Sequence, residues 1–286
     1  MAFKDSLAHL LCPPRVPFVV VKGGGDLGTG VAWRLHRCGC RVLVTEIAHP
    51  TVVRRTVAFA SAVYKGAIVI DGVTAHLAGS DGEIEACWTA NEVPVLVDPQ
   101  AAVVERLQPE AVVDALVAKR NKGTRISDAA VVVAVGPGFT AGVDCHAVVE
   151  SNRGHNLGRV ILNASAEPNT GMAGMVGGES VRRVLHAPVG GIFEPLREIG
   201  DRVEAGELVA RVDGTPIYSQ LDGVVRGLLY AGLTVRAGQK VGDVDPRGVV
   251  AHCFTISDKA LAVGGGAVEA ILYLLREKGT KGLSGF

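Results

Sequence analysis

Apolar residues in this chain come in short runs that glycines interrupt, and the first run is the most informative. Phe18 to Val21 are four consecutive apolar residues, and they lead into Gly23, Gly25 and Gly28 and then into the helix-compatible stretch 29–35. This order predicts a strand, a tight turn and a helix. In a turn of this spacing the first glycine permits the bend, the second lets the backbone approach a phosphate, and the third lets the helix pack on the strand.

A carboxylate at the end of the next predicted strand adds to this pattern. The stretch 41–46 predicts a strand that ends in Glu46, which stands 18 residues after Gly28, about where a ribose-binding carboxylate belongs. Backbone amides at the helix start would face an anion, which the helix dipole favours. We therefore expect a nucleotide site at Gly23, Gly25, Asp26, Gly28 and Glu46. The alternative is that the glycines only close the turn and that Glu46 is a solvated strand end.

Further strand and helix patterns alternate along the first half of the chain. Helical spacing over 50–64 carries Arg54 and Arg55, which either contact a bound phosphate or form a solvated basic face. Strand patterns at 67–70 and 73–77 flank the turn dipeptide 71–72, a helix is expected at 80–91, and strands at 94–97, 114–116 and 129–135 follow. This alternation predicts an α/β fold with a Rossmann-like doubly wound parallel sheet.

A second glycine turn follows the apolar run 129–135. Gly136 and Gly138 flank a proline, and the strand-like segment 145–150 begins only six residues after Phe139, an interval too short for a crossover helix. Polar residues then follow the strand, and strand ends in such sheets line the ligand crevice. We expect the ligand site to include Gly136, Gly138, Glu150, Asn152, Arg153, His155 and Arg159. The alternative is a polar loop that caps the sheet.

The region after residue 187 repeats itself with a shift of 32 residues. Gly191, Gly200 and Gly206 match Gly223, Gly232 and Gly238, and valines match in phase with them. Two copies of a strand-turn-strand unit that pack together explain the repeat. The stretch 187–212 resembles the biotinyl/lipoyl carrier fold, which implies a small β domain of the barrel-sandwich hybrid type. The chain has no lysine from 123 to 239, so neither biotin nor lipoate is expected.

These patterns together predict the domain organisation. The expected units are a Rossmann-like α/β domain at 1–180, a biotinyl/lipoyl-like β domain at 181–248, and a C-terminal helical segment at 249–286 that packs back on the first domain. Three consecutive glycines, 264–266, fall in or before the last helix, where close packing or contact with a ligand would offset their low helix propensity. The glycine-rich stretch 163–178 is either a linker or a functional loop.

Composition excludes several classes of partner. Hydrophobic residues make up 48% of the 286 residues, and 29 basic residues balance 29 acidic ones, so neither nucleic acid nor an anionic membrane is an expected partner. No apolar stretch approaches the length of a spanning helix and the first apolar run is too short for a signal peptide, which predicts a cytoplasmic protein. The six cysteines form no CxxC pair, so no metal site is expected.

Several long motifs together resemble a known family. KGGGDLGTGVAWRL, GPGFTAG, VVESNRGHNLGR, AEPNTG, APVGGIF, VGDVDPRG and ISDKALAVGGGAVEAIL occur in order over nearly the whole chain. They resemble the YqeB-type accessory proteins of the selenium-dependent molybdenum hydroxylase system. The resemblance implies a maturation role, with a molybdenum hydroxylase or its maturation proteins as partners and with NAD(P) or a molybdopterin-type nucleotide as the bound ligand. It carries over no catalytic residue, and it leaves self-association into a homo-oligomer open.

Two other functions stay open from the residues alone. An NAD(P)-dependent oxidoreductase in the same pathway would use His155 or His146 as its proton donor, and a non-catalytic scaffold would dock the hydroxylase through the β repeat. Cys145 is a candidate for transient selenium attachment, or else a buried and inert thiol.

Overall fold

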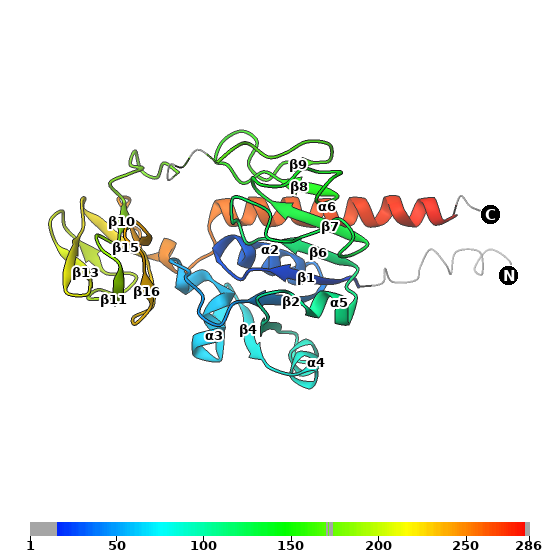
Figure 1. Ribbon diagram of the computed structural model, residues 1–286, viewed down its shortest axis with the longest axis horizontal. Helices are drawn as coiled ribbons and strands as arrows, with labels where there is room; N and C mark the ends of the chain where they lie inside the picture. The colour runs from blue at the N-terminus through cyan, green and yellow to red at the C-terminus, as the bar shows by residue number, and fades with distance from the viewer. Residues whose placement is uncertain (1–15, 170, 172–173, 284–286) are drawn as a thin grey trace.

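The computed structural model describes residues 16–283 except 170, 172 and 173. Two parts stand out in Figure 1: a large sheet flanked by helices, and a smaller all-β part at the other end of the molecule. The N-terminal apolar run, which the sequence predicts to be too short for a signal peptide, lies outside the described residues.

Nine strands of the described chain form the large sheet, in the order β3-β4-β5-β2-β1-β6-β7-β8-β9. From β4 to β8 neighbouring strands are parallel, while β3 and β9 add antiparallel edges. The strands are β1 (Phe18–Lys22), β2 (Arg41–Glu46), β3 (Ala67–Ile70), β4 (Val73–Ala78), β5 (Val93–Val97), β6 (Ala111–Asp114), β7 (Val131–Val135), β8 (Ala147–Val149) and β9 (Val160–Ile161).

Helices cover both faces of this sheet. The α-helices are α2 (Asp26–Arg37), α3 (Ala62–Lys65), α4 (Asp81–Thr89), α5 (Val103–Leu107) and α6 (Asp258–Leu283). Helices α2 and α6 pack together over alternate valines of β1, β2, β6 and β7, and residues of α4 and α5 cover the opposite side chains of β1, β2 and β6. Gly30 of α2 and Gly264 of α6 lie backbone to backbone, because a Cβ on either would stand 2.4 Å from a carbonyl oxygen of the other helix. Close packing, one of the two expectations for the glycine triplet, therefore accounts for Gly264.

The prediction of a Rossmann-like doubly wound parallel sheet is wrong. The sheet is mixed, because β3 and β4 are joined by the tight turn at Asp71 and Gly72, and because β9 returns antiparallel to β8. A doubly wound sheet also needs a helix at each crossover, whereas the connections from β6 to β7 and from β7 to β8 contain no helix in this described part of the chain. Buried valine runs look alike in parallel and mixed sheets, so the sequence pattern did not separate the two.

The smaller part consists of two four-stranded antiparallel sheets, ordered β10-β17-β15-β12 and β14-β13-β11-β16. Its strands are β10 (Val184–His186), β11 (Gly191–Pro195), β12 (Arg202–Val203), β13 (Leu208–Val212), β14 (Thr215–Tyr218), β15 (Gly223–Leu228), β16 (Thr234–Val235) and β17 (Lys240–Asp245). The starts of β11, β12 and β13 recur as those of β15, β16 and β17 at the shift of 32 residues. Each sheet takes strands from both copies, so neither copy closes its apolar face alone. These two open sheets replace the predicted biotinyl/lipoyl-like barrel-sandwich hybrid.

The segment that joins β2 to β3 also differs from its prediction. The expected helix over 50–64 is replaced by two short 3-10 turns, η1 (Arg55–Val57) and η2 (Phe59–Ser61), followed by α3; a third turn, η3 (Val250–Cys253), precedes α6. Residues 53–56 contact the smaller part: the Val53 carbonyl accepts from the Leu228 amide at 2.7 Å, and Arg55 Nε donates to the Leu228 carbonyl at 3.0 Å. Tertiary contacts of this kind compensate for the intrahelical hydrogen bonds that the segment gives up.

Candidate ligand-binding site

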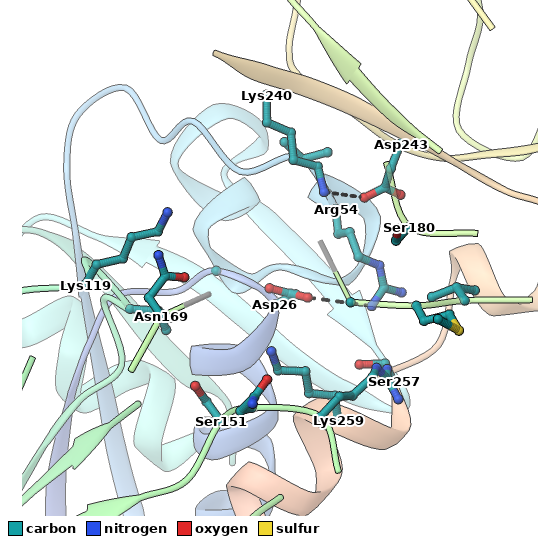
Figure 2. A pocket seen from close by; sticks show the side chains of 18 of the residues that line it. Asp26, Arg54, Lys119, Ser151, Asn169, Ser180, Lys240, Asp243, Ser257 and Lys259 are labelled. Atoms are coloured by element: carbon teal, nitrogen blue, oxygen red, sulfur yellow. Dashed lines mark hydrogen bonds and ion pairs between the residues drawn. The ribbon is translucent and has the colours of Figure 1, made fainter. Parts of the chain in front are cut away.

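A pocket of about 900 Å³ lies where the carboxyl ends of the central strands face the smaller β part. Its walls include Gly25 and Asp26 at the start of α2, the loop after β6, the turn after β7, and residues of β15 and β17. Figure 2 shows Lys240 and Asp243 of the β part above Asp26, Ser257 and Lys259 of the sheet part. Pockets that hold small-molecule ligands typically have volumes of about 300 to 1,000 Å³. The two parts of the molecule therefore enclose a space of ligand size.

The first glycine turn opens onto this pocket through the start of α2. Gly25 is the N-cap residue and makes no side-chain cap, and a Cβ at this position would meet only Val52 Cγ1 at 3.8 Å. The first-turn amides of a helix point along its axis and carry partial positive charge, which favours an anion in front of them. The predicted strand, turn and helix at 18–35 are confirmed as β1 and α2, and the exposed end of α2 faces the pocket.

Glu46 holds the turn instead of facing the pocket. Its carboxylate accepts the Gly24 amide at 2.9 Å and the Ile47 amide at 2.8 Å, and it is not among the described residues that line the pocket. Gly23 and Gly28 are also structural, because a Cβ on Gly28 would stand 1.9 Å from the Gly23 carbonyl oxygen. Of the five residues predicted around the first turn, Gly25 and Asp26 reach the pocket.

The pocket wall is strongly basic although the whole chain is neutral. Seven of its described residues are cationic and three are acidic, against 29 of each in the full sequence. The cations are Arg54, Lys119, Arg153, Arg183, Arg226, Lys240 and Lys259, and the acids are Asp26, Glu167 and Asp243. A concave wall with one predominant charge concentrates ligands of the opposite charge. The arrangement selects for anions.

Five of these cations have acidic partners. Arg153 forms a bidentate pair with Asp258 at 2.6 and 2.9 Å, Lys240 and Arg183 face Asp243 at 2.7 and 3.8 Å, and the remaining pairs are Arg226 with Asp245 at 3.3 Å and Arg54 with Asp26 at 3.7 Å. Burial by itself would raise the pKa of the Asp243 carboxyl, but Lys240 and Arg183 outweigh it and hold that pKa below its usual range. The pairs leave Asp243 ionised.

Lys119 and Lys259 are the two lining cations without such a partner. Within the described chain, neither ammonium lies within 4.0 Å of a carboxylate, and both side chains line the pocket. Lys259 is the second residue of α6 and is half-buried; burial lowers the pKa of its ammonium, while Asp26 and Glu150 act in the opposite direction. A ligand anion would therefore find its uncompensated positive charge at these two lysines.

The second glycine turn accommodates protein. A Cβ on Gly136 would stand 2.5 Å from Ser151 Oγ, and a Cβ on Gly138 would stand 2.7 Å from Arg120 Cα, so the neighbouring loops occupy the space that a phosphate would need. Pro137, between them, lines the pocket. That Gly136 and Gly138 bind the ligand stays a prediction, and the neighbours of these glycines are Ser151 and the loop after β6.

The polar residues after β8 divide between the pocket and the rest of the surface. Glu150 is 1% exposed, and its carboxylate accepts the amides of Asn152 at 2.6 Å and Glu167 at 2.7 Å, so it organises the loop. Asn152 and Arg153 line the pocket, whereas the exposed His155 and Arg159 are outside the described lining. Of the five residues predicted in this loop, Asn152 and Arg153 line the pocket, and their contact with a ligand stays a prediction.

Sequence reasoning missed the pocket residues that come from distant segments. Lys119 follows β6, Lys259 begins α6, and Arg183, Arg226 and Lys240 belong to the β part. The motif ISDKALAVGGG contained Lys259, at a helix start two residues after a capping serine, and that position was the one available signal. The other cations have no local pattern that separates them from surface charges.

The described cysteines and histidines do not form a second site. Cys145 is fully buried, and burial raises the pKa of its thiol to about 12, which corresponds to the inert alternative. His146 Nδ1 accepts the Val132 amide at 3.0 Å and lies outside the described pocket wall. No group of three or more His, Cys, Asp and Glu side chains in the described chain is placed to hold a metal ion. None of the described helices combines the length and apolar character needed to cross a bilayer.

Comparisons with known proteins give one strong sequence relative. The chain is 48% identical over 271 residues to the uncharacterized protein YqeB of Escherichia coli strain K12. The match covers 94% of this chain but 50% of the relative, so the chain spans about half the length of the curated relative it matches. No family model matches the chain.

Solved structures resemble the chain only weakly. A succinylglutamate desuccinylase/aspartoacylase from Rhodobacter sphaeroides is 28% identical over 23% of this chain and 22% of its own, with a TM-score of 0.20. An aspartoacylase family protein from Mesorhizobium loti is 14% identical over 80% of this chain and 85% of its own, with a TM-score of 0.27. These names are not those of the predicted fold class, and likeness at such TM-scores establishes neither a shared fold nor a shared activity.

Proposed function

We propose that this protein binds a phosphate-bearing ligand of nucleotide size in the pocket between the sheet part and the β part. The observation that carries the proposal is the pocket wall, where two unpaired lysines and the uncapped start of α2 face the same space. Anions bind at helix N-termini because the free amides and the helix dipole act together, and lysine ammonium groups add point charges for phosphate. A dinucleotide or the nucleotide form of the molybdenum cofactor belongs to this class of ligand.

We propose further that the protein serves as an accessory protein in the maturation of a selenium-dependent molybdenum hydroxylase. The support is the family resemblance of its motifs, together with its 48% identity to YqeB of Escherichia coli. In this role the pocket would hold the cofactor's nucleotide, or a dinucleotide, while the hydroxylase is loaded. The basic wall suits such an anionic cargo.

Binding is tested by calorimetry with NAD, ADP and GMP on the wild-type chain and on a variant that blocks the pocket. Gly25→Phe is suited to this purpose because a side chain at Gly25 projects past Val52 without a backbone clash. We expect at least one of these nucleotides to bind the wild-type chain with micromolar affinity and lose at least about tenfold in the variant, since contacts to charged groups are worth more than about 1.4 kcal/mol. Gly82→Phe, in α4 with no neighbour within 4 Å, is the matched control.

The maturation role is tested in a host that contains a selenium-dependent molybdenum hydroxylase and lacks the gene for this protein. The wild-type chain and Gly82→Phe should restore hydroxylase activity, and Gly25→Phe should not. Full restoration by Gly25→Phe would separate the maturation role from the pocket. Absence of any nucleotide binding by the wild-type chain would contradict the binding proposal itself.

A further inference from the structure

The loop after β6 has an unusual backbone at the point where it meets the pocket. Val117 and Lys119, which both line the pocket, have φ angles of +51° and +63°. Positive φ is costly for residues other than glycine and is a true outlier for a β-branched residue such as valine. Strained backbone of this kind persists only when its surroundings hold it in place, and it concentrates at functional sites.

The surroundings that hold this loop can be identified. The buried Asp114 accepts the Leu116 amide at 3.1 Å and the Thr124 hydroxyl at 2.6 Å, so one carboxylate fixes both ends of the loop. Lys22 Nζ donates to Thr124 Oγ1 at 2.5 Å from the neighbouring strand. At the middle of the loop, the backbone of Arg120 fills the space that a side chain on Gly138 would occupy. The second glycine turn therefore makes room for the loop that carries Lys119.

Lys119 and Lys259 reach the pocket from different sides. Figure 2 shows Lys119 beside Asn169 to the left of Asp26, and Lys259 below Asp26, between Ser151 and Ser257. A monophosphate carries about −1.5 to −2 charges at neutral pH, and a single phosphoryl group meets one ammonium most directly. Asp258 and Asp245, which lie outside the described lining, already pair with Arg153 and Arg226. The uncompensated charge of the wall is therefore at Lys119 and Lys259, and one phosphoryl group bound at either lysine leaves the other without an anion.

We infer that the ligand of this pocket contains a diphosphate, with one phosphoryl group held by Lys259 and the other by Lys119 on its strained loop. The inference rests on the proposed function, because it specifies the ligand class of the same site. The other lining cations already face carboxylates and set the background potential, whereas these two lysines discriminate a diphosphate from a monophosphate.

The experiment compares pyrophosphate with inorganic phosphate, and ADP with AMP, by calorimetry on the full chain. We expect the wild-type chain to bind the diphosphate member of each pair at least about tenfold more tightly. Lys119→Met and Lys259→Met should each remove that preference and change the affinity for inorganic phosphate by no more than about twofold, because one lysine remains. Lys122→Met, an exposed lysine of the same loop that does not line the pocket, is the matched control and should keep the wild-type preference.

A second pair of variants tests the loop without removing a charge. Gly138→Ala should displace the Lys119 loop and reduce the preference for pyrophosphate about tenfold. Gly142→Ala, which also has positive φ but has no neighbour within 4 Å, should keep the preference. The circular dichroism spectrum and the melting temperature of each variant show whether it is folded.

The outcomes separate this inference from the proposed function. Equal affinity of the wild-type chain for the two members of each pair would overturn the inference of a diphosphate ligand. Equal weakening of monophosphate and diphosphate binding by either lysine variant would also overturn it. In both cases the proposed anion site itself would still stand. A preference that survives in Lys119→Met alone would overturn the role of the strained loop. If the wild-type chain binds none of the four anions, both the inference and the proposed function fail.

Discussion

The two glycine turns of the large sheet follow similar buried valine strands but face different surroundings. At the first turn, the Gly25 end of α2 is open to the pocket. At the second turn, the backbone of Arg120 and the hydroxyl of Ser151 fill the space beside Gly138 and Gly136. A glycine therefore marks a close approach without specifying what approaches, and the neighbouring chain decides whether that is a ligand or protein.

The largest expected effect comes from the glycine that closes the first turn. Gly28→Ala places a Cβ 1.9 Å from the Gly23 carbonyl oxygen, so the helix and the turn must separate. We expect the variant to lose about 3 kcal/mol of unfolding free energy, as overpacked interiors do. Gly25→Ala, which faces open space, should cost less than about 1 kcal/mol. Urea unfolding measures both, and equal stability of the two variants would contradict the distinction between packed and open glycines.

The glycine triplet of α6 extends this comparison to a helix interface. A Cβ on Gly264 would stand 2.4 Å from the Gly30 carbonyl oxygen, whereas Gly265 has no neighbour within 4 Å. Gly264→Ala should destabilise the fold by about 2 kcal/mol through overpacking. Gly265→Ala should stabilise it by up to about 1 kcal/mol, because alanine has the higher helix propensity. Thermal unfolding of the two variants gives opposite shifts in Tm if the interface is as described.

The next effect separates the two functions considered for Glu46. Glu46→Ala leaves the Gly24 and Ile47 amides without their acceptor, so we expect a loss of about 1 to 2 kcal/mol in unfolding free energy. If the Glu46 carboxylate only holds the turn, the variant should weaken the binding of pyrophosphate and of ADP to a similar extent. A ribose contact predicts the opposite result, in which ADP weakens and pyrophosphate does not.

The smallest expected effect is a pH dependence of anion binding at Lys259, at the start of α6. Burial lowers the pKa of the Lys259 ammonium, with Arg153 acting in the same direction and Asp26, Glu150 and Asp258 opposing it. Only the charged ammonium attracts the anion, so the affinity for ADP is at its full value below the pKa of Lys259 and falls as the pH rises through that pKa. Because this pKa is lowered, the fall begins at a lower pH than it would for an ordinary lysine, whose pKa is about 10.4. Calorimetry with ADP from pH 7.5 upward measures the decline. Lys259→Arg keeps its charge and should move the decline to higher pH, and an identical profile for both chains would exclude Lys259 from the contact.

Short-range patterns determined much of this protein at the level of single elements. The runs at 18–21 and 41–46 became β1 and β2, the dipeptide at 71–72 became a hairpin turn, and Ser80 caps α4 by accepting the Glu83 amide at 3.3 Å. These features depend on neighbours a few residues apart, so the sequence contains the full information. The 32-residue shift in the β part is also visible in the sequence, because both copies obey the same packing rule.

Tertiary structure alone decided the sheet type and the composition of the pocket. Valine-rich runs bury equally well in parallel and mixed sheets. The direction of each strand therefore depends on the connection that precedes it, and the sequence pattern did not show which connections lack a helix. The pocket joins Gly25, Lys119, Arg226 and Lys259, which are up to 234 residues apart, and no local pattern links a lysine on a loop to one on a distant helix. Glu46 ends the second strand, as its spacing from the glycines predicts. Its carboxylate accepts the buried Gly24 amide, because a buried amide requires an acceptor close to it.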